Sequence, residues 1–506
     1  MLRDELREHL CNCLIPFWIK LQDTEHGGYY GWMDSGLHVD REAVKGCILN
    51  SRILWFFSNA PMCLGKTGQD GSEEAAGGQE IDRGDGGSAE SNPKEAGRWT
   101  KAELRGAADQ AYRFLREACV DREKGGVYWA VNYRGEPEDT TKHTYNQAFA
   151  VYALSSYFRA YHDREALNLA EELITVIESR CFDVHGYKEA LDRDFQPIPN
   201  DKLSENGVMA DRTMNTLLHV MEAYTEYLLA CREAMAAEGT VLEQTADGYE
   251  DNRAKQAEAM AGQDDVSAEP KTVSEQGSVA SERGDAGIGQ GNFTTEQAEQ
   301  AEQAEKAEAA RPHEKLVETK LRWILNLVET RIYNPKLHRQ EVFFNLDMES
   351  LIDLHSYGHD IEAAWLIDRC LDVLGDGELA RRISPVLRSL EKEVYEKAYS
   401  NHSLANECER GIVDTKRVWW VQAEGVVGFY NAWQKTGETR YRKASEEIWQ
   451  FIREHLADRR EGGEWFWYTD AQGNPAMEKP IVEPWKCPYH NGRMCMEIMR
   501  RSRQGF

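Results

Sequence analysis

The 506-residue chain lacks several features that would assign it to common classes of protein. No apolar run approaches the roughly 20 residues that a membrane-spanning helix needs. The start, MLRDELREHLCNCLIPFW, is charged and amphipathic, without the basic beginning, apolar stretch and cleavage site of a signal peptide. We therefore expect a cytoplasmic protein with no membrane partner.

Disulfide spacing and phosphate-binding loops are also missing. The 11 cysteines are odd in number and scattered, and no two are spaced C-x-x-C, so we expect free thiols. No glycine-rich loop of the P-loop or dinucleotide type occurs. The formal net charge of −27 opposes binding to nucleic acid phosphates. These absences predict no nucleotide cofactor and no nucleic acid partner.

Two segments differ from the rest in composition. Residues 66–98 and 238–312 are acidic, rich in small and polar residues, and together carry more than half of the net charge. Such sequences cannot bury enough apolar area to offset chain entropy. We interpret them as disordered insertions in a single catalytic domain that spans residues 1–506.

The remainder of the chain reads as a repeated unit of helix, hairpin and helix. Short aromatic hairpins follow paired glycines after Asp23, Asp121 and Arg459. Between them, apolar residues at helical spacing predict helices over Gln147–Tyr161, Thr213–Ala230, Lys315–Thr330, Ile361–Leu374, Ile383–Ala398, Trp420–Thr436 and Arg440–His455. This repeat favours an all-α closed ring of helix pairs, with the hairpin loops at one end around a central cavity. An irregular all-α protein is the alternative.

His359 is the first candidate for acid–base chemistry. It lies at or just before the first turn of a predicted helix, and Glu362 follows three residues later on the same side. A carboxylate bonded to imidazole fixes its tautomer and raises its basicity, which suits a general base. A zinc site with His355, His359 and Glu362 is an alternative. Gly358 opposes it by marking a turn before the helix, and a structural role for the histidines also stays open.

His490 follows Pro484 and Pro488 and is presented from a loop or a helix start, where functional side chains are common. A zinc set of Cys487, His490 and Cys495 matches no common spacing.

Three further polar residues interrupt apolar helices. Asn215 and His219 are four residues apart and share a face, and each alone is most simply a satisfied core polar group. Arg52 is a lone charge among apolar residues, so it needs an anionic partner or a site that develops negative charge.

At these residues the chain resembles the N-acylglucosamine 2-epimerase superfamily. The matching segments occur in family order and include Gly46–Trp55, Lys142–Phe149, Met214–His219, Tyr357–Ala363, Val418–Glu424 and Trp485–Asn491. The resemblance implies an (α/α)6 barrel with short β-hairpins at one end. It covers nearly the whole chain apart from the two insertions, which the family pattern does not contain.

The resemblance also implies roles for individual residues. His359 and His490 become the catalytic pair, without a metal or another cofactor. The polar groups that contact or support the sugar become Arg52, Tyr145, Asn215, His219 and Glu362. The aromatic walls of the cleft become Trp365, Trp420 and Trp485, with Trp419 as a neighbour.

The activity that the resemblance implies is inversion of C2 in the reducing-end sugar of a β-1,4-linked disaccharide such as cellobiose or lactose. His359 removes the C2 proton of a glucose-type sugar, and His490 reprotonates the cis-enediolate. The oligomeric state we expect is a monomer or a weak homodimer. Three alternatives stay open: mannose isomerisation or N-acylglucosamine epimerisation on the same scaffold, a glycoside hydrolase using Glu362 and Glu424, and a non-catalytic sugar-binding protein.

Overall fold

The computed structural model describes residues 2–65, 99–200, 202, 206–236 and 312–503. The predicted insertion 66–98 lies outside these residues, as do residues 238–311 of the second predicted insertion. The chain divides into two compact units, Met1–Ala230 with Val317–Phe506, and Cys231–Leu316. The first unit carries every predicted site residue.

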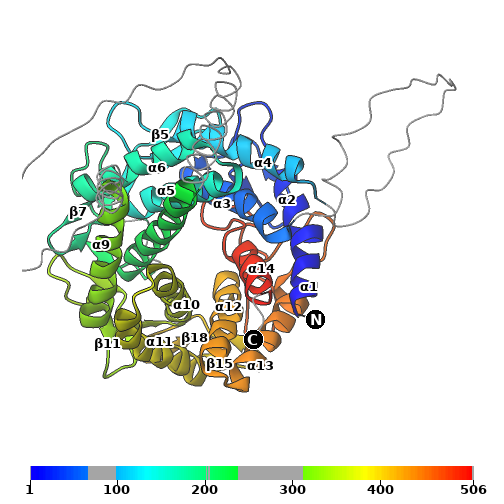
Figure 1. The fold of residues 1–506 in the computed structure, drawn as a ribbon. Coiled ribbons are helices and arrows are strands. Elements are labelled where there is room, and N and C mark those ends of the chain that lie inside the picture. The colour runs from blue at the N-terminus through cyan, green and yellow to red at the C-terminus, as the bar shows by residue number, and fades with distance from the viewer. Residues whose placement is uncertain (1, 66–98, 201, 203–205, 237–311, 504–506) are drawn as a thin grey trace, which may run out of the picture. The chain divides into compact units, whose positions relative to one another are not determined.

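Helices form most of the first unit, as the apolar spacing predicts (Figure 1). They are α1 (Leu2–His9), α2 (Ile15–Lys20), α3 (Cys47–Leu64), α4 (Lys101–Phe114), α5 (Thr144–Tyr161), α6 (Arg164–Val176), the helix over 214–236, α9 (Pro312–Leu327), α10 (Tyr357–Leu374), α11 (Gly377–Lys397), α12 (Trp419–Thr436), α13 (Thr439–Phe451) and α14 (His490–Arg501). Five-residue π-helical turns follow α1, α4, α6, α9 and α13: η1 (Leu10–Leu14), η2 (Leu115–Cys119), η3 (Ile177–Cys181), η4 (Val328–Ile332) and η5 (Ile452–Leu456).

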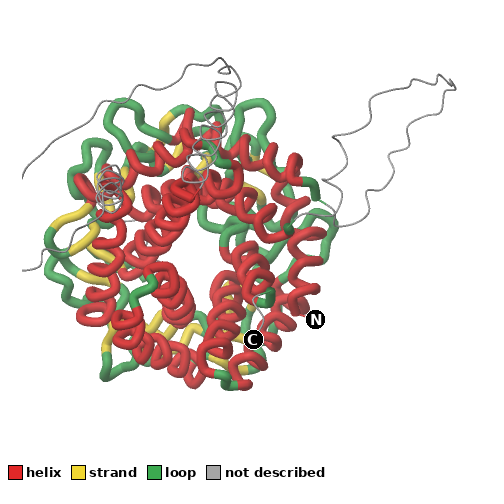
Figure 2. The backbone as a smooth tube through the Cα atoms, in the orientation of Figure 1, coloured by secondary structure: helices red, strands yellow, loops and turns green. Residues whose placement is uncertain are grey.

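The helices of the first unit form an inner and an outer circle (Figure 2). In the inner circle α3 packs against α5, α10 against α12, α12 against α14, and α14 closes back on α3. The outer helices α4, α6, α11 and α13 each pack against an inner neighbour, and α1 packs against α14. This arrangement confirms the predicted (α/α)6 barrel.

Short antiparallel strands connect the helices, near the three predicted aromatic hairpins and also at places where the sequence predicts none. They are β1 (Trp32–Met33), β2 (Val39–Asp40), β3 (Lys45–Gly46), β4 (Ala130–Val131), β5 (Pro137–Asp139), β6 (Lys142–His143), β7 (Phe182–Asp183), β8 (Gly186–Tyr187), β9 (Ala190–Leu191), β10 (Arg212–Thr213), β11 (Tyr333–Asn334), β12 (Arg339–Gln340), β13 (Phe343–Phe344), β14 (Leu354–Ser356), β15 (Tyr399–Ser400), β16 (Ser403–Leu404), β17 (Glu407–Glu409), β18 (Ile412–Asp414), β19 (Arg417–Val418) and β20 (Tyr468–Thr469).

The strand before an inner helix pairs with a strand of the next hairpin, which joins successive repeats. Thus β3 pairs with β4, β6 with β9, β10 with β13, β14 with β17 and β19 with β20. A bridge between Met33 and Val482 joins the two ends of the chain in the same way. The start of each of these inner helices is therefore held by backbone hydrogen bonds to a neighbouring repeat.

A basic residue stands shortly before each inner helix, two positions before the first five helices and four before α14: Lys45, Lys142, Arg212, His355, Arg417 and Lys486. Several of these residues are buried and paired with an acid. Lys45 bonds to Asp23 at 2.6 Å, and Lys486 bonds to Glu464 at 2.6 Å. Breaking such a buried pair leaves an uncompensated charge, so the pairs hold hairpin and helix start together.

This common starting point defines two sets of side chains. The residues seven positions after each basic residue are called the first ring: Arg52, Phe149, His219, Glu362, Glu424 and Arg493. The residues fourteen positions after it are called the second ring: Asn59, Ser156, Glu226, Arg369, Asn431 and Arg500. Seven residues make about two helical turns, or about 10 Å, so both rings use the same side of each helix at different depths.

Two expectations about the whole chain can be compared with the described residues. None of their helices is both long and apolar enough to cross a membrane. All 11 cysteines are free thiols, and most of them are buried, as the scattered spacing predicts.

Candidate active site

The helix starts surround a cavity of about 240 Å³ in the first unit. Nine of the ten predicted site residues line it: Arg52, Tyr145, Asn215, His219, His359, Glu362, Trp420, Trp485 and His490. Trp419, the expected neighbour of these tryptophans, also lines the cavity. The structure thus brings together side chains that lie as much as 438 positions apart in the sequence.

Trp365 differs from its predicted place in the cleft wall. Its side chain is 0 % exposed, and its indole N–H donates to Glu424 Oε2 at 2.9 Å. Trp365 is three residues after Glu362 on α10, so it lies nearly one turn deeper on the same face. It supports a carboxylate behind the cavity and does not form the wall.

His359 lies in the first turn of α10, but its partner differs from the prediction. The ring Nδ1 is 2.7 Å from Ser356 Oγ, and Glu362 bonds elsewhere. The prediction that Glu362 orients His359 is therefore wrong: Ser356, immediately before the helix, reaches the ring instead. Burial lowers the pKa of His359 to about 3, so the imidazole is neutral at neutral pH.

The sequence suggested that Gly358 marks a turn before the helix. In the structure Gly358 is instead the second residue of α10. A Cβ atom at this position would come within 2.5 Å of the Trp420 ring. The missing side chain lets Trp420 lie across the helix start, with its ring centroid 4.7 Å from that of His359. His355 lies on strand β14 and bonds to Asp360 at 2.9 Å, so the two histidines share no helix face for zinc.

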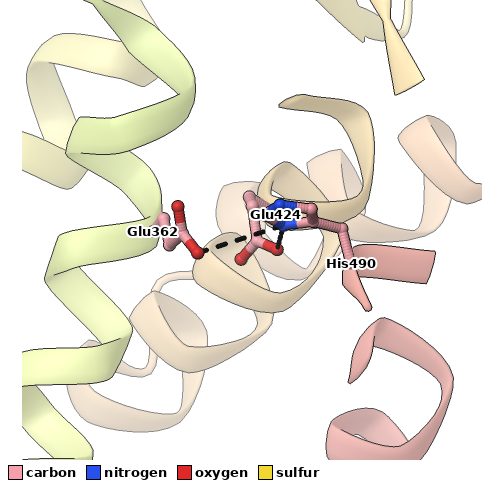
Figure 3. Close-up of side chains that lie close together, drawn as sticks. All are labelled: Glu362, Glu424 and His490. Atoms are coloured by element: carbon pink, nitrogen blue, oxygen red, sulfur yellow. Dashed lines mark hydrogen bonds and ion pairs between the residues drawn. The ribbon is translucent and has the colours of Figure 1, made fainter. Parts of the chain in front are cut away.

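His490 is the first residue of α14, close to the predicted helix start. Its Nδ1 is 2.7 Å from Glu424 Oε1 and 3.9 Å from Glu362 Oε1 (Figure 3). Burial lowers the pKa of His490, and nearby arginines lower it further. An ionised Glu424 can only accept, so it places the proton of neutral His490 on Nδ1 and leaves Nε2 as the basic nitrogen.

His219 has a carboxylate partner of its own. Its Nδ1 is 2.9 Å from Glu222 Oε2, and both side chains are buried. Burial lowers the pKa of His219, while Glu222 acts in the opposite direction. The ring contacts Tyr145 and Phe149, with centroids 5.1 and 4.8 Å away.

Arg52 is 2 % exposed, and the part of the chain that the structure describes gives it no carboxylate partner of the kind that a buried guanidinium usually has. It donates to Tyr145 Oη at 2.7 Å and to the Trp485 carbonyl oxygen at 3.3 Å. Its guanidinium lies over the rings of Phe149 and Tyr489, 4.2 and 4.9 Å from their centroids. Among the described residues no carboxylate ion-pairs with Arg52, so its charge is available to an anion in the cavity.

Arg493 is the main site residue that the sequence reading missed. This buried guanidinium donates to Glu222 Oε1 at 2.6 Å, to Glu424 Oε1 at 2.7 Å and to Glu362. Burial and the neighbouring Glu424 together raise the pKa of Glu362 to about 8, although Arg493 opposes the rise. The signal that could have found Arg493 is its seven-residue distance from Lys486, which matches that of Arg52 from Lys45.

Glu362, Glu424 and His490 lie close enough together to hold a metal ion, with ligand atoms within 4.8 Å of one another (Figure 3). Arg493 bonds to both carboxylates, however, and supplies the positive charge that an ion would bring. The same geometry opposes a hydrolase, because the two acids share one guanidinium. Oxygens of the two acids lie within 4.8 Å of each other, which is closer than the roughly 5–10 Å at which glycosidase carboxylates flank a bond.

Comparison with known proteins places this architecture among sugar epimerases. A family model described as N-acylglucosamine 2-epimerase (GlcNAc 2-epimerase) matches residues 94–246 and 313–491. The chain belongs to the N-acylglucosamine 2-epimerase family. This membership confirms the resemblance inferred from the sequence motifs.

Full-length relatives make the relationship more specific. A cellobiose 2-epimerase from Eubacterium cellulosolvens is 40% identical, over 99% of this chain and 98% of the relative. One from Ruminococcus albus is 37% identical, over 99% of each chain. The solved structure of a cellobiose 2-epimerase from Bacillus thermoamylovorans B4167 is 34% identical, with a TM-score of 0.73 over 99% of each chain. A D-mannose isomerase structure, 15% identical with a TM-score of 0.64, shares the fold.

Proposed function

We propose that this enzyme is a cellobiose 2-epimerase, which interconverts glucose and mannose at the reducing end of β-1,4-linked disaccharides. The observation that carries the proposal is the placement of His359 and His490 in one cavity, each in contact with the Trp420 ring. Inversion at carbon requires a proton to leave one face and return to the other, and two neutral imidazoles suit that task. The full-length similarity to cellobiose 2-epimerases supports the same substrate.

The sugar ring must open before C2 becomes acidic. In the proposed step, His490 Nε2 takes the proton from the O1 hydroxyl, the C1–O5 bond breaks, and O5 takes a proton from a water molecule, which becomes hydroxide. The resulting imidazolium is stabilised by Glu424, which lies 2.7 Å from its other nitrogen. A carboxylate partner therefore suits the histidine that stores a proton.

His359 then removes the C2 proton of the open-chain glucose unit, which leaves a cis-enediolate with negative charge on O1. Arg52 is suited to stabilise that charge, because it is buried and has no carboxylate partner among the described residues. His490 delivers its stored proton to the opposite face of C2 and gives the mannose configuration. Ring closure re-forms the C1–O5 bond, returns the proton on His359 to O1 and gives the O5 proton back to the hydroxide, and the reverse reaction exchanges the two roles.

The remaining cavity residues are assigned to binding. Tyr145 and Asn215 would bind sugar hydroxyls, together with Glu362 and His219. Burial raises the pKa of Tyr145 to about 12, so its phenol stays neutral and can donate. Trp420 and Trp485, both partly exposed, would stack on the apolar faces of the two sugar rings.

Incubation with cellobiose in D2O, with and without a chelator, tests the proposal. We expect glucosyl-mannose with deuterium at C2 of its reducing-end sugar, at the same rate in both samples. Free glucose would indicate hydrolysis, and a ketose would indicate isomerisation. A product without deuterium at C2 would rule out the scheme in which one histidine removes the C2 proton and the other delivers a new one. Loss of activity with the chelator would indicate a metal.

Three broader expectations accompany the activity. We propose a cytoplasmic enzyme with one catalytic domain that includes both acidic insertions, and a monomer or weak homodimer in solution. Light scattering across a concentration series tests the last of these. A mass near 57.8 kDa at low concentration would fit, whereas a stable larger assembly would contradict it.

A further inference from the structure

Two histidine–glutamate pairs in the cavity share one cation. His490 bonds to Glu424 at 2.7 Å, and His219 bonds to Glu222 at 2.9 Å. Arg493 donates to both glutamates through different nitrogens, Nη2 to Glu424 and Nη1 to Glu222. The five groups therefore form a continuous chain across the cavity floor, from one imidazole to the other.

The geometry of this chain requires a guanidinium. Arg493 presents several N–H donors in one rigid plane, so it can bind acids on different helices at once, whereas a lysine is a single flexible point charge. It also donates to Glu362, and its plane lies over Tyr489 and Trp365, 4.3 and 4.8 Å from the ring centroids. Its orientation is thus fixed from all sides.

The charge of Arg493 bears on the protonation of Glu424. Burial raises the pKa of this carboxyl, and the donors Arg493 and Trp365 oppose the rise by bonding to its two oxygens. Without Arg493, Glu424 would take up a proton more easily. A protonated carboxyl would donate to Nδ1 of His490 and leave the imidazole proton on Nε2, where a base needs a lone pair.

The same cation acts on the second pair. Burial alone would raise the pKa of Glu222, but Arg493 and His219 lower it below its usual value. An ionised Glu222 accepts from His219 and holds that ring in the same tautomer as His490. Neither glutamate is near enough to His359, which bonds to Ser356, to play this part for it.

We propose that Arg493 is a positioning residue that keeps Glu424 and Glu222 ionised and so holds His490 and His219 with their basic Nε2 atoms free. In the catalytic scheme, which rests on the proposed function, this readies His490 to accept the O1 proton at ring opening. The proposal concerns the resting enzyme, so it can be tested before any substrate is added.

The titratable groups around His490 come from every inner element that contributes to this cluster. They are Arg52 from α3, His219 and Glu222 from the helix over 214–236, Glu362 from α10, Glu424 from α12, and Tyr489 and Arg493 beside His490 itself. Arg52 and Arg493 both lower the pKa of His490 after burial. Removing either arginine should therefore raise the pKa of His490 and move the acidic limb of the activity–pH profile upward.

The test uses full-length enzyme with ¹⁵N-labelled histidine, in wild-type, Arg493→Met and Arg493→Lys forms. His490→Gln and His219→Gln identify the two signals. In wild type we expect both imidazoles neutral with the proton on Nδ1. Arg493→Met should move the His490 proton to Nε2, and Arg493→Lys should give an intermediate state. An unchanged tautomer in folded Arg493→Met would overturn the proposal, whether or not the enzyme epimerises cellobiose.

Kinetics supply a second readout. Arg493→Met should lower kcat by about 10²-fold with little change in KM, and should move the acidic limb of the pH profile upward. If Arg493 acts through Glu424, Arg493→Lys should cost much less in a Glu424→Gln background than in wild type. Equal costs in both backgrounds would contradict the proposal, and this pair of variants carries the test if Arg493→Met does not fold.

Arg500→Met is the matched control. Arg500 lies on the same helix, seven residues further along, and donates to Asn59. Its loss should lower stability without moving the tautomer or the pH profile. A shift as large as that of Arg493→Met would mean that any lost charge on α14 has this effect, and the specific role of Arg493 would be refuted.

Discussion

The two rings of the inner helices are built alike but bonded differently. In the second ring, Glu226 accepts from Arg159 at 2.6 Å, from Arg369 at 2.5 Å and from Ser156 at 3.1 Å. Arg500 donates to Asn59 at 2.5 Å. In the first ring, Arg52 meets aromatic faces and no carboxylate among the described residues, while three glutamates crowd around Arg493. In the second ring Glu226 and Arg369 pair with each other, whereas in the first ring Arg493 takes both glutamates and Arg52 pairs with no carboxylate among the described residues.

This difference assigns a different use to each ring. Matched buried charges cost much when broken, so they serve stability. Around the cavity, Arg52 has no carboxylate partner among the described residues, and the histidines are neutral. A substrate can therefore supply the negative charge and the protons that these groups are placed to bind. Variants that disturb one ring should therefore change either catalysis or folding, with little effect on the other property.

The largest expected effect is on catalysis at the cavity. His359→Ala and His490→Ala should each lower epimerisation by at least about 10³-fold, because each removes one of two acid–base groups. Thermal unfolding should stay close to that of wild type. His38→Ala, which removes a side chain that is 84% exposed, is the control. Substantial activity in either cavity variant would end the two-base scheme.

Stability should respond most to the second ring. Glu226→Ala leaves Arg159 and Arg369 without their common partner, and breaking a buried pair in this way costs about 3–5 kcal/mol. Urea unfolding measures the loss, and kcat per folded molecule should remain within about twofold of wild type. A large fall in kcat with unchanged stability would reverse the assignment of the two rings.

Acid should affect the cavity histidine His359 and the second ring in different pH windows. The pKa of His359 is lowered by burial to about 3, below that of an unfolded histidine, so the unfolded chain binds its proton first and stability falls as pH drops below about 6.5. Although burial opposes it, Arg159 and Arg369 lower the pKa of Glu226 to about 2, so its contribution persists until pH falls below about 4.5. As the pH falls from 6.5 to 4.5, the free energy of unfolding of His359→Asn should decrease less than that of wild type, by up to about 2 kcal/mol. The measurement is the free energy of unfolding of both proteins at pH 6.5 and at pH 4.5. An equal loss between the two pH values in wild type and His359→Asn would contradict this prediction.

The fold was predictable because it depends on local patterns that repeat. Helical spacing of apolar residues recurs along the chain, and paired glycines precede aromatic residues in three of the hairpins, after Asp23, Asp121 and Arg459. A closed ring needs little more. Arg52 could be selected as a lone charge in an apolar helix, and His359 by its place at a helix start with Glu362 three residues later. The role of His490 depended mainly on the resemblance to the family.

The partners of those residues were not predictable by the same reasoning. Sequence spacing favours Glu362 for His359 because they are three apart on one helix, but the carboxylate turns to Arg493 on α14. Glu424 reaches His490 from another helix, 66 residues away. Such contacts depend on the diameter of the ring and the rotation of each helix, and the place of Trp365 behind the cavity depends on the same quantities.

The smallest expected effect concerns the unequal support of the two catalytic histidines. His490 has a charged partner in Glu424, whereas His359 has the Ser356 hydroxyl at 2.7 Å. A neutral hydrogen bond contributes about 0.5–1.5 kcal/mol, so Ser356→Ala should lower kcat by about 3- to 10-fold. Glu424→Gln should cost more, because it also removes the charge that stabilises the imidazolium. Steady-state kinetics on cellobiose compares the two variants, and a greater loss from Ser356→Ala would mean that His359, not His490, stores the proton during ring opening.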